Sequence, residues 1–129
     1  MKKVYQTRSG IRLGNCLQAC VASMFERHID VIPDFGQYGR YWLDRMESWL
    51  KVQGLKMEWV DYEGGRLKLH NGCQICVLPS HGNKCTHAVL VNSVGRIIHD
   101  PKKGGVSWVG GLISDRNNVK ILLITKEEK

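Results

Sequence analysis

The spacing of apolar residues changes once along this chain, close to Gly54. Before that point apolar residues recur at helical spacing, as they do at Leu17, Cys20, Val21 and Met24. After it they alternate with polar residues, as they do at Leu55, Met57 and Trp59. A helix cannot satisfy an alternating pattern, and a strand cannot satisfy a helical one. The sequence therefore predicts an α+β domain, in which two helices precede a largely antiparallel sheet.

Two helices are expected in the first part of the chain. The first runs from about Cys16 to Arg27 and presents one apolar stripe, with Asn15 as its N-cap. The second runs from about Arg40 to Gln53 and ends at Gly54, a natural residue for the position after a helix. The apolar positions of the second helix are Leu43, Met46 and Leu50.

The remainder of the chain is predicted to be strand, with turns at its glycine-containing segments. After the strand that begins at Leu55, the expected strands are Cys73 to Leu78, His87 to Val91, Arg96 to His99, Val106 to Val109 and Val119 to Thr125. All 129 residues fit one domain, since the chain has the size of a single core and contains no linker or repeat.

The sequence favours a cytoplasmic protein. Lys2 and Lys3 are followed by polar residues instead of the apolar run of a signal peptide, and no stretch approaches the ~20 apolar residues that span a bilayer. Cytoplasmic thiols stay reduced, so the five cysteines are expected to be catalytic, metal-binding or buried. Neither a membrane nor a cofactor is expected as a partner.

The net charge of +7 is unevenly distributed. Residues 1–15 contain four cationic side chains and no acidic one. Such a face attracts nucleic acid or an acidic protein. No nucleic-acid-binding motif accompanies the charge, so a solvated surface is the favoured interpretation and a nucleic-acid partner is not.

Cys16 is the candidate nucleophile. It occupies the first turn of the first predicted helix, where unpaired backbone N–H groups and the helix dipole favour a thiolate. A cysteine nucleophile needs a base, and the base needs an acceptor that orients it. His87 opens an apolar strand and is the candidate base, while Asp100, at the end of the next strand, is the candidate acceptor.

The turn between these two strands decides whether the base and its acceptor meet. A two-residue turn at Val94-Gly95 places Asp100 diagonally across from His87 on the same face of the hairpin. A three-residue loop shifts the pairing by one residue and brings His99 to that face instead, unless a further bulge near Asp100 restores the first pairing. Both registers remain open on the sequence.

The ordered set of Asn15-Cys16, His87 with its apolar strand, and Asp100-Pro101 resembles the papain-like cysteine peptidases. It is most similar to their compact branch, which includes bacteriocin-leader peptidases and small papain-fold proteins of phage and bacterial genomes. The resemblance implies a papain-like domain in which the Cys-bearing helix packs on the sheet. It also implies an oxyanion-binding role for Gln6, the only glutamine that precedes Cys16.

The resulting expectation is a cysteine-dependent hydrolase that cleaves peptide, isopeptide or amide bonds of a protein or peptide through a thioester, with no metal. The same triad serves deamidases and acyltransferases. A different alternative is a basic binding module with a zinc site, since tetrahedral zinc takes thiolate and imidazole ligands. The residues for such a site are Cys73, Cys76, His81, Cys85 and His87. Cys20 is expected in the helix core.

Overall fold

A computed structural model of the chain describes residues 3–7, 15–79, 86–102 and 108–127. The helices are α1 (Cys16–Phe25) and α2 (Trp42–Val52), with short 3-10 turns at Ile29–Val31, Phe35–Tyr41 and Ile113–Asp115. The strands are β1 (Leu55–Asp61), β2 (Gln74–Pro79), β3 (Thr86–Val91), β4 (Ile97–His99) and β5 (Lys120–Lys126). This order confirms the α+β prediction. Among the described residues, no helix is long and apolar enough to cross a bilayer.

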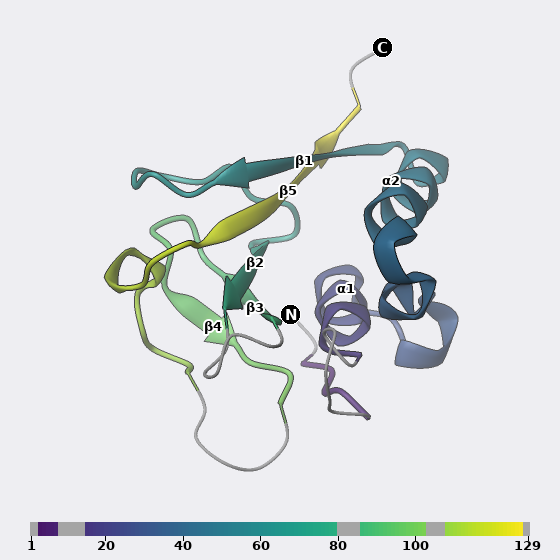
Figure 1. The fold of residues 1–129 in the computed structure, drawn as a ribbon, viewed down its shortest axis with the longest axis horizontal. Helices are drawn as coiled ribbons and strands as arrows, with labels where there is room; N and C mark the ends of the chain where they lie inside the picture. Colours follow the sequence, from purple (N-terminus) through teal and green to yellow (C-terminus); the bar gives the residue numbers. More distant parts are fainter. Residues whose placement is uncertain (1–2, 8–14, 80–85, 103–107, 128–129) are drawn as a thin grey trace.

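The five strands form one sheet in the order β1-β5-β2-β3-β4, and all neighbouring strands are antiparallel. Both helices lie on the same side of this sheet (Figure 1). Helix α1 packs on β3 and β2 near one end of the sheet, whereas α2 packs on β1 near the other. The helix that carries Cys16 is thereby placed against the strand that carries His87.

Successive side chains of each strand point to opposite faces of the sheet, so the apolar residues are divided between two cores. In β2, Ile75 and Val77 belong to a core shared with α1 and α2, here called the helix-side core. Cys76 and Leu78 point the other way, into a smaller core with Ile113, here called the outer core. The sheet is therefore covered on both faces, which explains why β2 and β3 are apolar at nearly every position.

Helix α1 is buried almost all around, not only along one stripe as predicted. Eight of its ten residues are buried, and only Gln18 and Phe25 are partly exposed. Small side chains at Ala19, Ala22 and Ser23 allow neighbouring segments to approach closely, so the expected solvent-facing side does not exist. The helix also ends two residues earlier than predicted, because Glu26 adopts the left-handed conformation with φ 54°.

Asn15 occupies the N-cap position of α1, but its side chain does not cap the helix. Its Nδ2 instead donates a hydrogen bond to Thr7 Oγ1 (2.6 Å), and its Oδ1 accepts one from the Thr7 backbone N–H (3.0 Å). The predicted N-cap position is therefore confirmed, although the Asn15 side chain makes no capping hydrogen bond. Asn15 joins the N-terminal segment to the start of the helix.

Helix α2 begins at Trp42 instead of Arg40 because the residues before it form a 3-10 turn, interrupted at Gly39 with φ 56°. Its predicted apolar face is confirmed, with Met46 and Leu50 fully buried and Leu43 packed against the helix-side core. The end of the helix is also confirmed, since Gly54 follows it with φ 77°.

Five of the six predicted strands are present with shifts of one or two residues at their ends. The exception is Val106 to Val109. Residues 106 and 107 lie outside the described part of the chain, and Trp108 and Val109 belong to a turn closed by a hydrogen bond from Gly111 N–H to Trp108 O (3.1 Å). The glycines at 110 and 111 favour this turn over a continued strand.

The β3–β4 hairpin combines the two registers that the sequence left open. Near the turn Val91 pairs with Ile97, as in the three-residue loop, but the next pair is Leu90 with His99. A bulge at Ile98 produces this shift of one residue. Continued along the hairpin, the shifted register places Asp100 on the same face as His87.

Candidate active site

Cys16 is the first residue of α1 and is 1% exposed. Its Sγ accepts a hydrogen bond from the backbone N–H of Ala88, over 3.4 Å. The residue that follows the candidate base therefore touches the candidate nucleophile. A backbone N–H aimed at sulfur stabilises negative charge on it, as do the unpaired N–H groups of the first helical turn.

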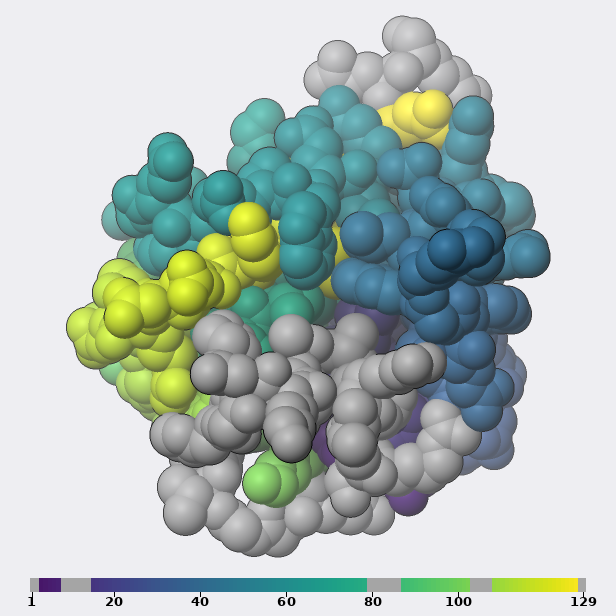
Figure 2. Space-filling model, viewed as in Figure 1, coloured from purple at the N-terminus to yellow at the C-terminus, as the bar shows by residue number. Residues whose placement is uncertain are grey.

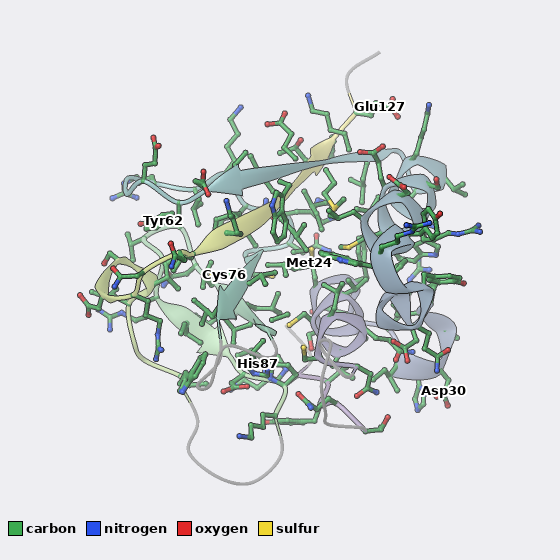
Figure 3. The ribbon with its side chains drawn as sticks, in the orientation of Figure 1. Met24, Asp30, Tyr62, Cys76, His87 and Glu127 are labelled. Carbon is green, nitrogen blue, oxygen red and sulfur yellow. The ribbon has the colours of Figure 1, made fainter. Side chains whose placement is uncertain are left out.

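His87 lies at the start of β3, close to the N-terminal end of α1 (Figure 3). Its Nε2 is 2.6 Å from Oδ1 of Asp100, and its side chain is only 15% exposed. Because Nε2 donates to the carboxylate, Nδ1 is the ring nitrogen that remains for the thiol. The structure thus brings together Cys16, His87 and Asp100, three residues widely separated in the sequence.

The electrostatics of the imidazole favour its protonated form. Burial lowers the pKa of His87, but the hydrogen bond to Asp100 and the nearby Cys16 together raise it to about 9. Both partners favour the imidazolium, since each contributes negative charge or a hydrogen-bond acceptor. A proton that leaves Cys16 is therefore held on His87.

Asp100 is held in place by two backbone groups as well as by the imidazole. The Lys102 N–H donates to its Oδ1 (3.0 Å), and the Trp108 N–H donates to its Oδ2 (3.2 Å). Burial raises the pKa of Asp100, but these hydrogen bonds and the one from His87 outweigh it and lower the pKa overall. The carboxylate is consequently ionised and fixed in its orientation toward the ring.

Trp108 is a member of the site that the sequence did not reveal. Its ring meets the His87 ring edge to face, with centroids 5.7 Å apart and planes at 89°. On Trp108 the Arg116 guanidinium lies 4.1 Å from the ring centroid. The Trp108 ring therefore limits movement of the His87 imidazole, and the Trp108 backbone N–H holds the Asp100 carboxylate. Its position in a predicted strand gave no signal of this double contact.

The N-terminal segment 3–7 reaches the site through contacts with β4 and α1. The Val4 carbonyl is 2.7 Å from His99 Nε2, and the Gln6 N–H donates to the Pro101 carbonyl (2.8 Å). Gln6 is 8% exposed and precedes Thr7, which is bonded to Asn15. The predicted oxyanion residue is thus anchored between Asp100-Pro101 and the residue before Cys16.

A cavity of about 260 Å³ opens beside the N-terminal end of α1. The residues that line it include Thr7, Asn15, Gln18, Asp30 and Asp34. Asn15, which directly precedes Cys16 in the sequence, lines the cavity, whereas Cys16, His87 and Asp100 do not.

The other described cysteines have a different environment. Burial raises the pKa of Cys73 to about 11 and that of Cys76 to about 12, and it also raises the pKa of Cys20 well above its ordinary value. Cys20 lies in the helix-side core, as expected. These thiols are hydrophobic core residues, and their burial favours the neutral, unreactive form.

The proposed zinc ligands are not brought together where they are described. Cys73 belongs to the helix-side core and Cys76 to the outer core, on opposite faces of the sheet. His81 and Cys85 lie outside the described residues. Among those the structure describes, no cluster of three His, Cys, Asp or Glu side chains is positioned to hold a metal ion.

No protein family, curated protein or solved structure matches the chain.

Proposed function

We propose that the protein is a papain-like, cysteine-dependent hydrolase acting on the amide bond of a peptide or protein. The observation that carries this proposal is the position of the His87 ring, which has Asp100 2.6 Å from Nε2 and Cys16 close enough to raise its pKa. A nucleophile, a base and an orienting carboxylate in this order constitute the machinery of thiol acyl transfer.

The first half of the reaction forms a thioester. Cys16 gives its proton to His87, and the sulfur attacks the carbonyl carbon of the substrate. The carbonyl oxygen gains negative charge and is stabilised by the Cys16 N–H, which has no partner within the helix, and by the Gln6 side chain. His87 then donates its proton to the departing amine as the carbon–nitrogen bond breaks.

The second half returns the enzyme to its starting state. His87 removes a proton from water, the hydroxide attacks the thioester carbon, and the carboxylic acid product leaves as the proton returns to sulfur. Asp100 stabilises the imidazolium in both halves, since its own ionisation is secured by the Lys102 and Trp108 N–H groups. When an amine replaces water, the same residues carry out acyl transfer, and when the substrate is a primary amide, they carry out deamidation.

Selective alkylation tests the proposed nucleophile. Intact protein is treated with iodoacetamide at neutral pH, and the modified residues are mapped by mass spectrometry. We expect Cys16 to react first and the His87→Ala variant to react about tenfold or more slowly at this position. A Cys20→Ala variant is the matched control and retains the labelling of Cys16. Equally slow labelling of all thiols in the folded protein contradicts the proposal.

Activity on amide substrates tests the reaction. A peptide library is incubated with the protein and with its Cys16→Ala variant, and products are identified by mass. Cleavage that requires Cys16 supports hydrolysis, while a gain of the mass of an added amine, or a one-dalton gain at glutamine, identifies transfer or deamidation. Hydrolysis that the Cys16→Ala variant performs at full rate overturns the proposal.

A further inference from the structure

A second cavity, of about 490 Å³, lies at β1 and β5 beside the segment of residues 66–68. Lys56 and Glu58 of β1 and Leu123 and Thr125 of β5 line it, and these residues alternate with the ones that face the helices. Met57 and Ile124, for example, pack in the helix-side core. The cavity is therefore on the opposite face of the sheet from α1 and Cys16.

Positive charge dominates the walls of this cavity. Lys56, Arg66, Lys68 and Lys126 line it, and Glu58 carries the one carboxylate among the described lining residues. Within the described part of the chain none of these four cations forms an ion pair, although nearby Lys120 is paired with Asp61. Four unpaired like charges around one cavity repel one another, and a bound anionic ligand offsets this electrostatic repulsion.

One of these cations, Lys126, acts on the neighbouring His70. Burial lowers the pKa of His70, and the positive charge of Lys126 lowers it further. The cavity also has an apolar component, since Leu67 and Leu123 line it and pack against the outer core. Its size lies within the range of about 300–1,000 Å³ that is usual for binding sites.

We propose that this basic cavity, lined by Lys56, Arg66, Lys68 and Lys126, binds an acidic peptide segment of a partner protein. Glutamate or aspartate side chains pair with the four cations, and apolar side chains of the segment cover Leu67 and Leu123. Strand β1 lies at the edge of the sheet and pairs only with β5 among the described strands. An extended peptide can therefore lie along this edge, as in strand addition.

The lining favours a peptide over a nucleic acid. Single-stranded nucleic acids bind through aromatic platforms on which bases stack, and no aromatic residue lines this cavity among the described residues. The Glu58 carboxylate repels a continuous phosphate backbone, whereas a peptide can place a neutral or basic residue opposite it. Figure 2 shows that β1 and β5, in teal and yellow, lie beside each other at the molecular surface.

Fluorescence anisotropy tests this inference. The probe is a fluorescein-labelled peptide of alternating glutamate and leucine, and its counterpart has glutamine in place of glutamate. We expect binding of the glutamate peptide alone, weakening as salt is raised. The Lys56→Glu/Lys68→Glu variant is expected to bind about tenfold or more weakly. The matched control Arg27→Glu/Lys51→Glu makes the same change in net charge elsewhere on the surface and retains the affinity.

Several results would overturn the inference. These are equal binding of the glutamine peptide, equal weakening by the control variant, absence of binding, or tighter binding of a thymidine oligonucleotide through the same lysines. Thermal melting verifies that each variant is folded, and Arg66→Gln/Lys126→Gln provides a milder second test. The Cys16→Ala variant should bind the peptide as the natural chain does, so failure of the proposed hydrolase activity leaves this test unaffected.

Discussion

The backbone N–H of Ala88 donates a hydrogen bond to Sγ of Cys16 over 3.4 Å and links the strand of the candidate base directly to the candidate nucleophile. Ala88 is a fully buried residue of β3 and belongs to the same core as α1. The distance between thiol and imidazole is thus set by the packing of a helix on a strand, and a change in that packing reaches the reacting atoms.

An Ala88→Val substitution is expected to disturb the site through this contact. The two added methyl groups overfill the space between α1 and β3, and we expect a loss of about 1–3 kcal/mol in the free energy of unfolding. Alkylation of Cys16 should slow as well, because the helix is displaced from the strand. Val91→Ile overfills the outer core on the same strand and should reduce stability without slowing alkylation. Equal alkylation rates for both variants would disprove the link.

Replacement of Asp100 by asparagine should weaken the base without removing it. The variant loses the negative charge beside the imidazolium, so the pKa of His87 is expected to fall below its value of about 9. The loss of a charged hydrogen bond, about 1.5–3 kcal/mol, corresponds to a roughly tenfold to hundredfold slower alkylation of Cys16 at neutral pH. NMR titration of His87 measures the first effect and mass spectrometry the second.

Asp115→Asn is the matched control for that substitution, because Asp115 is an exposed carboxylate in the 3-10 turn Ile113–Asp115. It should change neither the His87 titration nor the alkylation rate. An Asp100→Asn protein that titrates and reacts like the natural chain would show that the carboxylate has no orienting role.

Stability should depend on pH through His87. Its pKa is about 9 in the folded chain against an ordinary value of 6.5, so the folded state holds the proton more tightly than the unfolded state. The stabilisation is fully present below about pH 6.5 and is lost as the pH rises through about 9, a decrease of about 1–3 kcal/mol. Urea denaturation at a series of pH values measures it.

The His87→Asn variant should lack this decrease, whereas His28→Asn should retain it, since the His28 side chain is 73% exposed and lies outside the site. If the difference in stability between the natural chain and His87→Asn is the same at pH 6 and pH 9, the imidazolium does not stabilise the fold.

Gly95 is expected to be required for the hairpin that positions Asp100. Its φ is +78°, and a Cβ there would lie 2.9 Å from Ile113 Cγ1 and 3.1 Å from the Tyr62 hydroxyl. Gly95→Ala should therefore cost more than the ~1 kcal/mol of a strained backbone alone. Gly64→Ala is the control, since Gly64 has φ +92° and no atom within 4 Å of the added Cβ. Thermal melting compares them, and equal losses would contradict the close approach.

The sequence predicted the elements of this fold well where one local signal dominated. The change of periodicity at Gly54 separates the helices from the strands in the structure, and Gly54 itself ends α2. The all-round burial of α1 was not predictable in the same way, because it depends on the N-terminal segment and on β3, which are remote in sequence. Tertiary packing, not helical propensity, determines which sides of a helix are covered.

In the candidate site, too, local sequence signals were predictive and tertiary contacts were not. The residue types and their order were sufficient to select Cys16, His87 and Asp100. Whether the three side chains lie close together depends on a bulge at Ile98, and no residue type in the hairpin predicts where that bulge falls. Trp108 was missed for a related reason. Its contacts with His87 and Asp100 arise from a turn, and the sequence pattern there had predicted a strand.

The clamping of segment 3–7 between α1 and β4 has a consequence for synthesis of the chain. The Val4 N–H is bonded to Ser23 in α1, and the Val4 carbonyl to His99, which is made much later. A nascent chain that ends shortly after Cys16 has neither the candidate base His87 nor His99, which contacts the N-terminal segment. The proposed triad of Cys16, His87 and Asp100 therefore cannot form until residue 100 has been made, so its assembly comes late in the synthesis of these residues.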